Sequence, residues 1–204
     1  MKKYLVLVVL LTACWLGFSY HKQMQMLRGE ELVTDAYWGD LLSVKNDAEA
    51  GAPLGYRFTF EDDKRQYVNQ TFNALHAAAS GGNEDVILFL LEQGLPLNSR
   101  TPEGWTPLFV AARDGQAEAA KLLIFKGADL NAQSKLGATA LTMAVTQPFE
   151  TEKARLNLLE YMLKRGADVN LADTYGHTPL YYATVQGNKD VIKLLEQYRA
   201  KTDI

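Results

Sequence analysis

The sequence is short of the residues that metal-binding and disulfide-bonded proteins need. Among its 204 residues the single cysteine, Cys14, excludes an intramolecular disulfide and any zinc site built on several cysteines. The three histidines, His21, His76 and His177, are too scattered for the ligand spacing of a metal site. Acidic residues outnumber basic ones by 24 to 21, and no basic stripe marks a nucleic-acid surface. We therefore expect no metal, no cofactor and no nucleic-acid partner.

Motifs of catalysis are missing as well. The sequence contains no Gly-x-Ser-x-Gly nucleophile elbow and no His-Glu-x-x-His zinc motif. It also lacks the two glycine-rich patterns that cradle phosphates, Gly-x-x-x-x-Gly-Lys-Ser/Thr and Gly-x-Gly-x-x-Gly. Cys14 lies in an apolar N-terminal segment, which is not where a nucleophile is expected. We therefore expect that the protein is not an enzyme.

The first twenty residues have the pattern of an export signal. Lys2 and Lys3 precede an apolar run from Leu5 to Leu11, and Thr12-Ala13-Cys14 follows directly. An aliphatic residue and two small residues before a cysteine resemble the lipobox of bacterial lipoproteins. In that family the thiol is acylated, and lipid holds the mature chain to a membrane. The resemblance implies lipidation of Cys14 and a periplasm-facing place in the bacterial cell envelope.

Two other interpretations of this segment stay open. Because Trp15-Leu16-Gly17-Phe18 prolongs the apolar run, residues 4–20 could remain as an uncleaved signal anchor, at the short end of what spans a ~30 Å hydrocarbon core. Ordinary cleavage near Ser19 is the other alternative. All three place the chain beyond residue 21 outside the cytoplasm, whereas a start at Met24 or Met26 would give a shorter cytosolic form. We assign residues 1–20 to the signal or anchor and 21–34 to a linker.

Internal repetition is the strongest feature of the chain. Four leucines are separated by 33, 33 and 39 residues, and two sets of glycines follow the same register. These landmarks are Leu75, Leu108, Leu141 and Leu180, then Gly82, Gly115 and Gly187, and then Gly94, Gly127 and Gly166. A generic helical bundle would not place glycines in a fixed register, so the pattern predicts stacked repeats.

The unit over residues 101–133 shows the repeat best. It contains Thr-Pro-Leu at 106–108, which returns at 178–180, and Gly-Ala-Asp-Leu-Asn at 127–131, which returns at 166–170 with Val in place of Leu. The unit resembles an ankyrin repeat. The resemblance implies an all-α solenoid of stacked helix-turn-helix units with short hairpin loops. It also implies that His76, which keeps the Leu-His part of the motif, is a structural hydrogen-bonding residue.

Each piece of the motif has a mechanical reason. Thr106 and Thr178 are expected to cap the first helix of their repeats, and the proline after each occupies the first helical position, where no N–H is needed. Gly115 is expected to end that helix in the left-handed conformation. Leu108 and Ala111 are expected to face inward, where a small alanine lets neighbouring helices approach.

The boundaries follow from the same register. About ten additional residues fall in a loop at 55–64, and six more lie between the helices of the third repeat, within 147–154, where Pro148 and Phe149 are expected to form a projecting elbow. Polar residues in the last helix predict a solvated cap. We expect one domain over 35–204, with a cap at 35–67 and repeats at 68–100, 101–133, 134–172 and 173–204.

In ankyrin proteins, the concave face formed by hairpin tips and the ends of first helices binds another protein. Carried over to this sequence, the tip positions are Asn69, Gln70, Phe72, Pro102, Glu103, Trp105, Lys135, Leu136, Ala138, Thr174, Tyr175 and His177. The helix-end positions are Ser80, Arg113, Asp114, Thr146, Gln147, Val185 and Gln186. The aromatic tips stand out because large rings dominate binding hot spots. For Trp105 the alternative is packing against the adjacent hairpin, and for His177 it is simple solvation.

These features together predict a non-enzymatic protein, monomeric when free, that binds one specific protein partner. Small exported ankyrin lipoproteins are similar to immunity proteins, which implies an inhibitor of a secreted effector such as a phospholipase. The alternative is a periplasmic adaptor that supports a resident enzyme such as a catalase.

Overall fold

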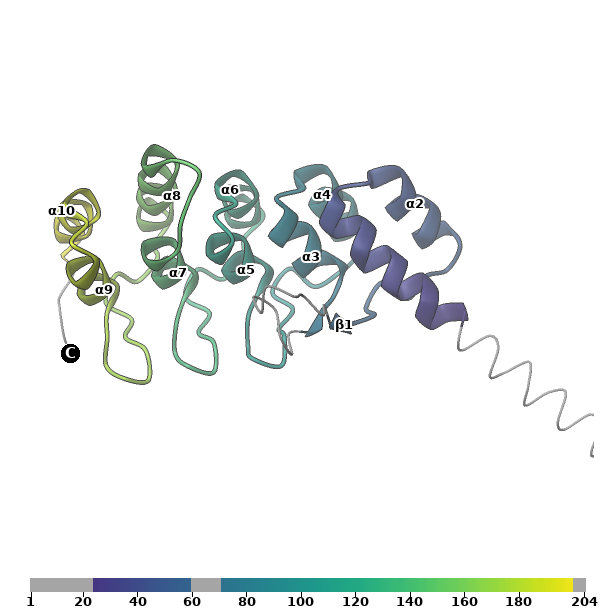
Figure 1. The fold of residues 1–204 in the computed structure, drawn as a ribbon, viewed down its shortest axis with the longest axis horizontal. Helices are drawn as coiled ribbons and strands as arrows, with labels where there is room; N and C mark the ends of the chain where they lie inside the picture. Colours follow the sequence, from purple (N-terminus) through teal and green to yellow (C-terminus); the bar gives the residue numbers. More distant parts are fainter. Residues whose placement is uncertain (1–23, 60–70, 200–204) are drawn as a thin grey trace, which may run out of the picture.

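The repeats of the sequence form pairs of antiparallel helices that stack side by side (Figure 1). The computed structural model describes residues 24–59 and 71–199. The helices are a first one over residues 24–38 and then α2 (Leu41–Glu49), α3 (Ala74–Gly81), α4 (Glu84–Glu92), α5 (Pro107–Arg113), α6 (Ala117–Phe125), α7 (Ala140–Thr146), α8 (Glu152–Lys164), α9 (Pro179–Gln186) and α10 (Lys189–Gln197). A short antiparallel pair, β1 (Phe58–Thr59) and β2 (Thr71–Phe72), is added to them. The helical stack confirms the predicted all-α solenoid.

Two rows of helices build the solenoid. The first helices of the repeats, α3, α5, α7 and α9, pack successively against one another, and α4, α6 and α8 form the second row, with α10 at its end. The hairpins that connect successive repeats project from the first row (Figure 1). Each unit touches only its neighbours, which is the arrangement of a repeat protein.

The first helices begin at the predicted caps. The Thr106 side chain accepts a hydrogen bond from the Phe109 N–H at 3.2 Å, and Thr178 accepts one from the Tyr181 N–H at 3.3 Å. A proline follows each cap as the first helical residue. In the first repeat Asn73 replaces the threonine and accepts from the His76 N–H at 3.1 Å. Such caps satisfy backbone donors that have no partner inside the helix.

Gly115 follows α5 in the predicted left-handed conformation, with φ +74°. The Pro148 carbonyl oxygen of the next repeat would lie 2.8 Å from a Cβ at this position. Both the positive φ and the close approach of the next repeat therefore require glycine here.

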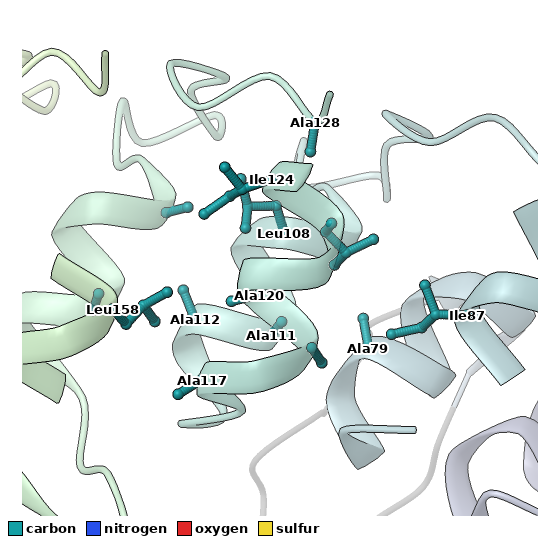
Figure 2. Packing of buried hydrophobic residues seen from close by; sticks show 14 of the residues in the cluster. Ala79, Ile87, Leu108, Ala111, Ala112, Ala117, Ala120, Ile124, Ala128 and Leu158 are labelled. Atoms are coloured by element: carbon teal, nitrogen blue, oxygen red, sulfur yellow. The ribbon is translucent and has the colours of Figure 1, made fainter. Parts of the chain in front are cut away.

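Small side chains set the spacing of the stack. Ala111, Ala112 and Ala120 are completely buried, and Figure 2 shows them at the contact between α5 and α6. Leu108 fills the adjoining space, and Leu158 packs from α8. Because alanine has no bulk beyond Cβ, helix backbones lie close enough to bury the leucines of both rows.

Side-chain hydrogen bonds tie each repeat to the next. Asn98 Oδ1 accepts from the Asp129 N–H at 3.0 Å, and in the following repeat Asn131 Oδ1 accepts from the Asp168 N–H at 2.8 Å. These asparagines occupy the same place in successive units. The recurring Asn of the sequence pattern therefore joins neighbouring units.

The N-terminal part of the stack begins earlier than the sequence indicated. Residues 24–34, which we expected to be a linker, are helical, and Leu32, Val33 and Ala36 are completely buried. Their spacing of i, i+1 and i+4 places them on one helical face, which packs in the core. This helix and α2 together cover the first repeat (Figure 1).

The six additional residues of the third repeat lie mostly in a helix. α8 has thirteen residues, whereas α6 has nine, so about one turn is added and the connection over 147–151 stays short. Thr151 caps the lengthened helix by accepting from the Ala154 N–H at 3.1 Å. Pro148 is exposed, but Phe149 packs partly against the core, so the expected elbow projects less than predicted.

At the other expected insertion, residues 55–64, the described part contributes strand β1. The C-terminal helix α10 buries Val191 and Leu195 and exposes Glu196 and Gln197, as predicted for a solvated cap. None of the described helices is long and apolar enough to cross a membrane. Cys14 and the rest of the segment predicted to be an export signal lie outside the described residues.

His76 makes the structural contacts that the motif implied. The ring is almost completely buried, with Nδ1 2.6 Å from Asn73 Oδ1 and Nε2 3.1 Å from the Trp105 carbonyl oxygen of the next repeat. Burial lowers the pKa of His76 to about 4, although the Trp105 carbonyl favours the charged ring. The folded protein therefore holds the ring neutral.

We predict that acid weakens the stack through His76. Because the folded-state pKa lies below the unfolded value, the unfolded chain takes up the proton first, and stability falls as pH drops from about 6.5 towards 4. Urea unfolding at pH 7 and pH 5 should show that the wild-type chain loses about 2 kcal/mol more than His76→Gln. An equal loss in both proteins would contradict a neutral, buried ring.

Candidate protein-binding surface

The hairpins between repeats form a continuous row. The Lys135 N–H donates to the Glu103 carbonyl at 2.9 Å, and the Thr174 N–H donates to the Leu136 carbonyl at 3.0 Å. Backbone hydrogen bonds thus join the tips of three successive repeats. We call residues 102–105, 135–138 and 174–177 the hairpin row. It brings together most of the tip residues that the sequence singled out.

Two large apolar side chains protrude from neighbouring tips of the hairpin row. Leu136 is 61% exposed and Tyr175 is 71% exposed. Pro102 is exposed on the first tip of the row, and Lys135 Nζ lies 3.9 Å from Glu103 Oε2 in an ion pair open to solvent. An ion pair this exposed contributes little to stability. Because both side chains face solvent, their charges are accessible to a partner. This part of the row has the composition of a binding surface.

Trp105 is only partly available. Its ring stacks on Phe109 at a centroid distance of 5.4 Å, and the Arg113 guanidinium carbon lies 4.5 Å from the Trp105 ring centroid. The backbone carbonyl oxygen of Trp105 is the atom that faces His76 Nε2 at 3.1 Å. The ring therefore packs along its own repeat, which differs from the predicted alternative of packing on the adjacent hairpin.

The prediction that Phe72 is an exposed tip anchor is wrong. The side chain is 1% exposed and stacks on His76 at 5.7 Å, because strand β2 leads directly into α3 and turns the ring inward. Its neighbours in the predicted set, Asn69 and Gln70, lie outside the described residues.

A regular stacking rule explains these rings. In three repeats the residue just before the N-cap stacks on a ring four positions later, at the start of the first helix. The pairs are Phe72 with His76, Trp105 with Phe109, and His177 with Tyr181. The third repeat has Ala138 and Thr142 at these places. The four-residue spacing is visible in the sequence and was the signal for this packing.

Arg113 and Asp114, predicted to contact a partner, mainly form contacts within the protein itself. Arg113 Nε donates to Asp114 Oδ1 at 2.8 Å, and the Ser80 hydroxyl of the preceding repeat donates to Asp114 Oδ2 at 2.6 Å. The side chains of Arg113 and Asp114 are 11% and 7% exposed. They therefore hold two repeats together, and loss of either partner would leave the other charge poorly solvated.

The remaining helix-end candidates divide into two groups. Val185 and Gln186 are exposed at the end of α9, although Gln186 Nε2 also donates to the Thr146 carbonyl at 2.9 Å. Thr146 and Gln147 are half-buried. Val185 therefore adds a further apolar side chain, 68% exposed, to the accessible surface.

A carboxylate organises the last hairpin. Asp173 Oδ1 accepts from the N–H groups of Tyr175 and His177 at 2.9 and 3.0 Å, and Asp173 Oδ2 accepts from the Tyr182 hydroxyl at 2.5 Å. Desolvation raises the pKa of Asp173, but these hydrogen bonds outweigh it and hold the pKa below its usual value. The hydrogen bond from Tyr182 contributes most to the lowering. Desolvation and the Asp173 carboxylate raise the pKa of Tyr182 to about 12. Tyr175 is thus presented on a fixed turn with an ionised carboxylate behind it.

The arrangement defines a class of protein: stacked helix pairs that present a row of rigid hairpins as one extended surface. Among the described residues, no group of three or more His, Cys, Asp or Glu side chains is placed to hold a metal ion. Residues 54–134 and 126–204 match the family model of ankyrin repeats in three copies. The chain belongs to the ankyrin-repeat family, which indicates binding to another protein and is not a catalytic family.

The similarity to individual relatives covers only part of each protein. The chain is 35% identical over 71 residues to the mouse protein phosphatase 1 regulatory subunit 12A, a match that covers 35% of this chain and 7% of that protein. It is 30% identical over 133 residues to the ankyrin repeat, SAM and basic leucine zipper domain-containing protein 1 of Dasypus novemcinctus, covering 65% of this chain and 27% of that protein. The matched region thus spans about a quarter or less of these relatives.

Trp105 and Tyr175 should differ sharply in their effect on stability. We expect Trp105→Ala to lose about 2 kcal/mol or more, because it removes the ring between Phe109 and Arg113. Tyr175→Ala should change the free energy of unfolding by less than about 0.5 kcal/mol, since its ring is exposed. Urea denaturation followed by circular dichroism measures both. A loss as large for Tyr175→Ala as the one expected for Trp105→Ala would show that Tyr175 is a packing residue.

Proposed function

We propose that this protein inhibits one specific protein partner, which it binds through the hairpin row and the adjoining end of α9, and that it catalyses no reaction. The observation that carries the proposal is the exposure of Leu136 and Tyr175 on neighbouring tips that backbone hydrogen bonds hold together. Exposed aromatic and aliphatic anchors on a rigid support are typical of binding hot spots.

The rigidity of the row favours tight binding. The Asp173 carboxylate fixes the turn that carries Tyr175, and the tip before it is bonded to both of its neighbours. A partner that binds here orders few side chains, so little of the interaction energy is lost to conformational entropy.

The differences between repeats favour one specific partner. Successive tips carry a carboxylate at Glu103, an aliphatic chain at Leu136 and a phenol at Tyr175, and the third repeat alone has the lengthened α8. A partner that fits all of these must match them in order. The mouse relative is named as a regulatory subunit, which supports a role in controlling another protein.

We further propose that lipid on Cys14 tethers the protein to the bacterial cell envelope, facing the periplasm. The support is the lipobox-like Leu11-Thr12-Ala13-Cys14 after an apolar run. Nine residues separate Cys14 from the helix that begins at 24, so the solenoid lies within about 35 Å of its anchor. A target that works on the membrane, such as a secreted phospholipase, would meet the inhibitor there, as in an immunity protein.

Partner capture tests the binding surface. The double variant Leu136→Asp/Tyr175→Ala should fold normally but lose its partner, because both anchors are exposed and neither supports the core. Affinity purification from envelope extract with wild-type and variant protein, followed by mass spectrometry, measures the loss. The matched control is Phe125→Ala, which removes an equally exposed ring from α6, outside the hairpin row.

The identity and response of the captured protein decide between roles. An enzyme that acts on phospholipids, and that wild-type protein inhibits at one-to-one stoichiometry while the double variant does not, would support the immunity role. A resident enzyme such as a catalase, captured with its activity intact, would instead show an adaptor. Undiminished capture by the double variant would refute the assignment of the hairpin row.

Cys14→Ala tests the tether. A lipid-anchored protein should move from the membrane fraction to the soluble periplasmic fraction when the acylated thiol is lost. Fractionation with immunoblotting measures this, and Ser19→Ala serves as a variant that keeps the lipobox intact. Unchanged membrane association of Cys14→Ala would favour a signal anchor.

A further inference from the structure

The second and fourth repeats differ at one column of the binding surface. In the second, the positions just before the N-cap and four and eight residues later carry Trp105, Phe109 and Arg113, and the Arg113 guanidinium lies over the Trp105 ring. The corresponding positions of the fourth repeat are His177, Tyr181 and Val185. The ring stack is kept, but the place of the cation is taken by a short aliphatic side chain.

The rings of the fourth repeat form an open cluster. His177 and Tyr181 stack almost parallel, with ring centroids 4.0 Å apart and planes 3° apart, and the ring centroid of the exposed Tyr175 lies 6.2 Å from that of His177. We call Tyr175, His177 and Tyr181 the C-terminal aromatic cluster. Val185, at the position that corresponds to Arg113, is 68% exposed and carries no charge.

A negative charge lies behind the cluster. The Asp173 carboxylate, whose side chain is 6% exposed, lies 4.0 Å from His177 Nδ1. Within the part of the chain that the structure describes, no lysine or arginine forms an ion pair with Asp173 or lies over these rings. In the second repeat, by contrast, both the cation and its carboxylate partner, Asp114, are supplied internally.

We propose that the C-terminal aromatic cluster binds the guanidinium or ammonium group of an arginine or lysine that the partner protein presents. Electron-rich ring faces and a nearby carboxylate both attract a cation, and a planar guanidinium stacks on such rings. An acidic side chain would be repelled by Asp173. This assignment rests on the proposed binding function and specifies the chemistry of the partner at one point of the surface.

A small probe tests the cluster without the partner. We would titrate the full-length chain in detergent micelles with N-acetyl-arginine amide and follow the ring signals of His177 by NMR, which is practical because the chain has three histidines. The uncharged isostere N-acetyl-citrulline amide is the matched ligand control. Arginine should shift the His177 signals and bind about three- to fivefold more tightly than citrulline.

Val185→Arg tests the same site from the protein side. It rebuilds the arrangement of the second repeat, so its own guanidinium should occupy the cluster and weaken binding of the arginine probe at least threefold. Val185→Gln adds a long but neutral side chain, so the difference between the two variants isolates the effect of the guanidinium charge. Unchanged His76 ring signals in both variants would establish that they fold normally.

Several results would overturn the assignment. These are equal binding of citrulline and arginine, tighter binding of N-acetyl-glutamate amide, or equal probe binding by Val185→Arg and Val185→Gln. The outcome is separable from that of the proposed function. A chain that captures its partner but ignores arginine refutes the cation site alone, and one that binds arginine but captures no protein refutes the binding function alone.

Discussion

The whole structure depends on the close approach of helix pairs that cannot bury their own apolar faces. A single pair leaves one side of each leucine row open, and only the next pair covers it. Completely buried alanines such as Ala111 and Ala112 make that approach possible. Capping threonines and left-handed glycines then fix where each helix begins and ends, so that every pair presents the same contact surface to its neighbour.

This construction separates side chains that support the stack from those that are left for a partner. Rings just before the N-caps pack along their own first helix, and Asp114, paired with Arg113, accepts a hydrogen bond from Ser80 of the preceding repeat. The tips beyond them contribute almost nothing to the core, so their side chains are free to vary. Leu136 and Tyr175 stand at these tips, where large apolar groups have no structural purpose. The same backbone thus carries an invariant interior and a surface that differs in every repeat.

Much of the fold could be predicted because its signals are local. The Thr-Pro caps, the inward leucines and the register of the glycines each follow from one or two residues and the geometry of a helix end. The helix over 24–38 was missed because it lacks these landmarks, although Leu32, Val33 and Ala36 have helical spacing. The additional turn of α8 was mistaken for a loop, since an insertion is seen in the sequence as extra length without a conformation.

The binding candidates were harder to predict because exposure depends on neighbouring repeats. Treating all tip residues alike did not separate buried Phe72 from exposed Tyr175, although Phe72 lies directly before its N-cap and Tyr175 lies three residues before its own. Which ring turns inward is decided by contacts across the chain: β2 directs Phe72 inward, and Asp173 holds Tyr175 outward on its turn.

The lengthened α8 has a consequence for how a partner can align along the solenoid. A strictly periodic rod offers a ligand several equivalent positions, each shifted by one unit, and binding is then shared among them. An interruption in one unit removes that translational symmetry for any partner that reaches the second row of helices, where α8 is longer than α6 and α10. For such a partner, the thirteen-residue helix distinguishes one alignment along the rod from the others.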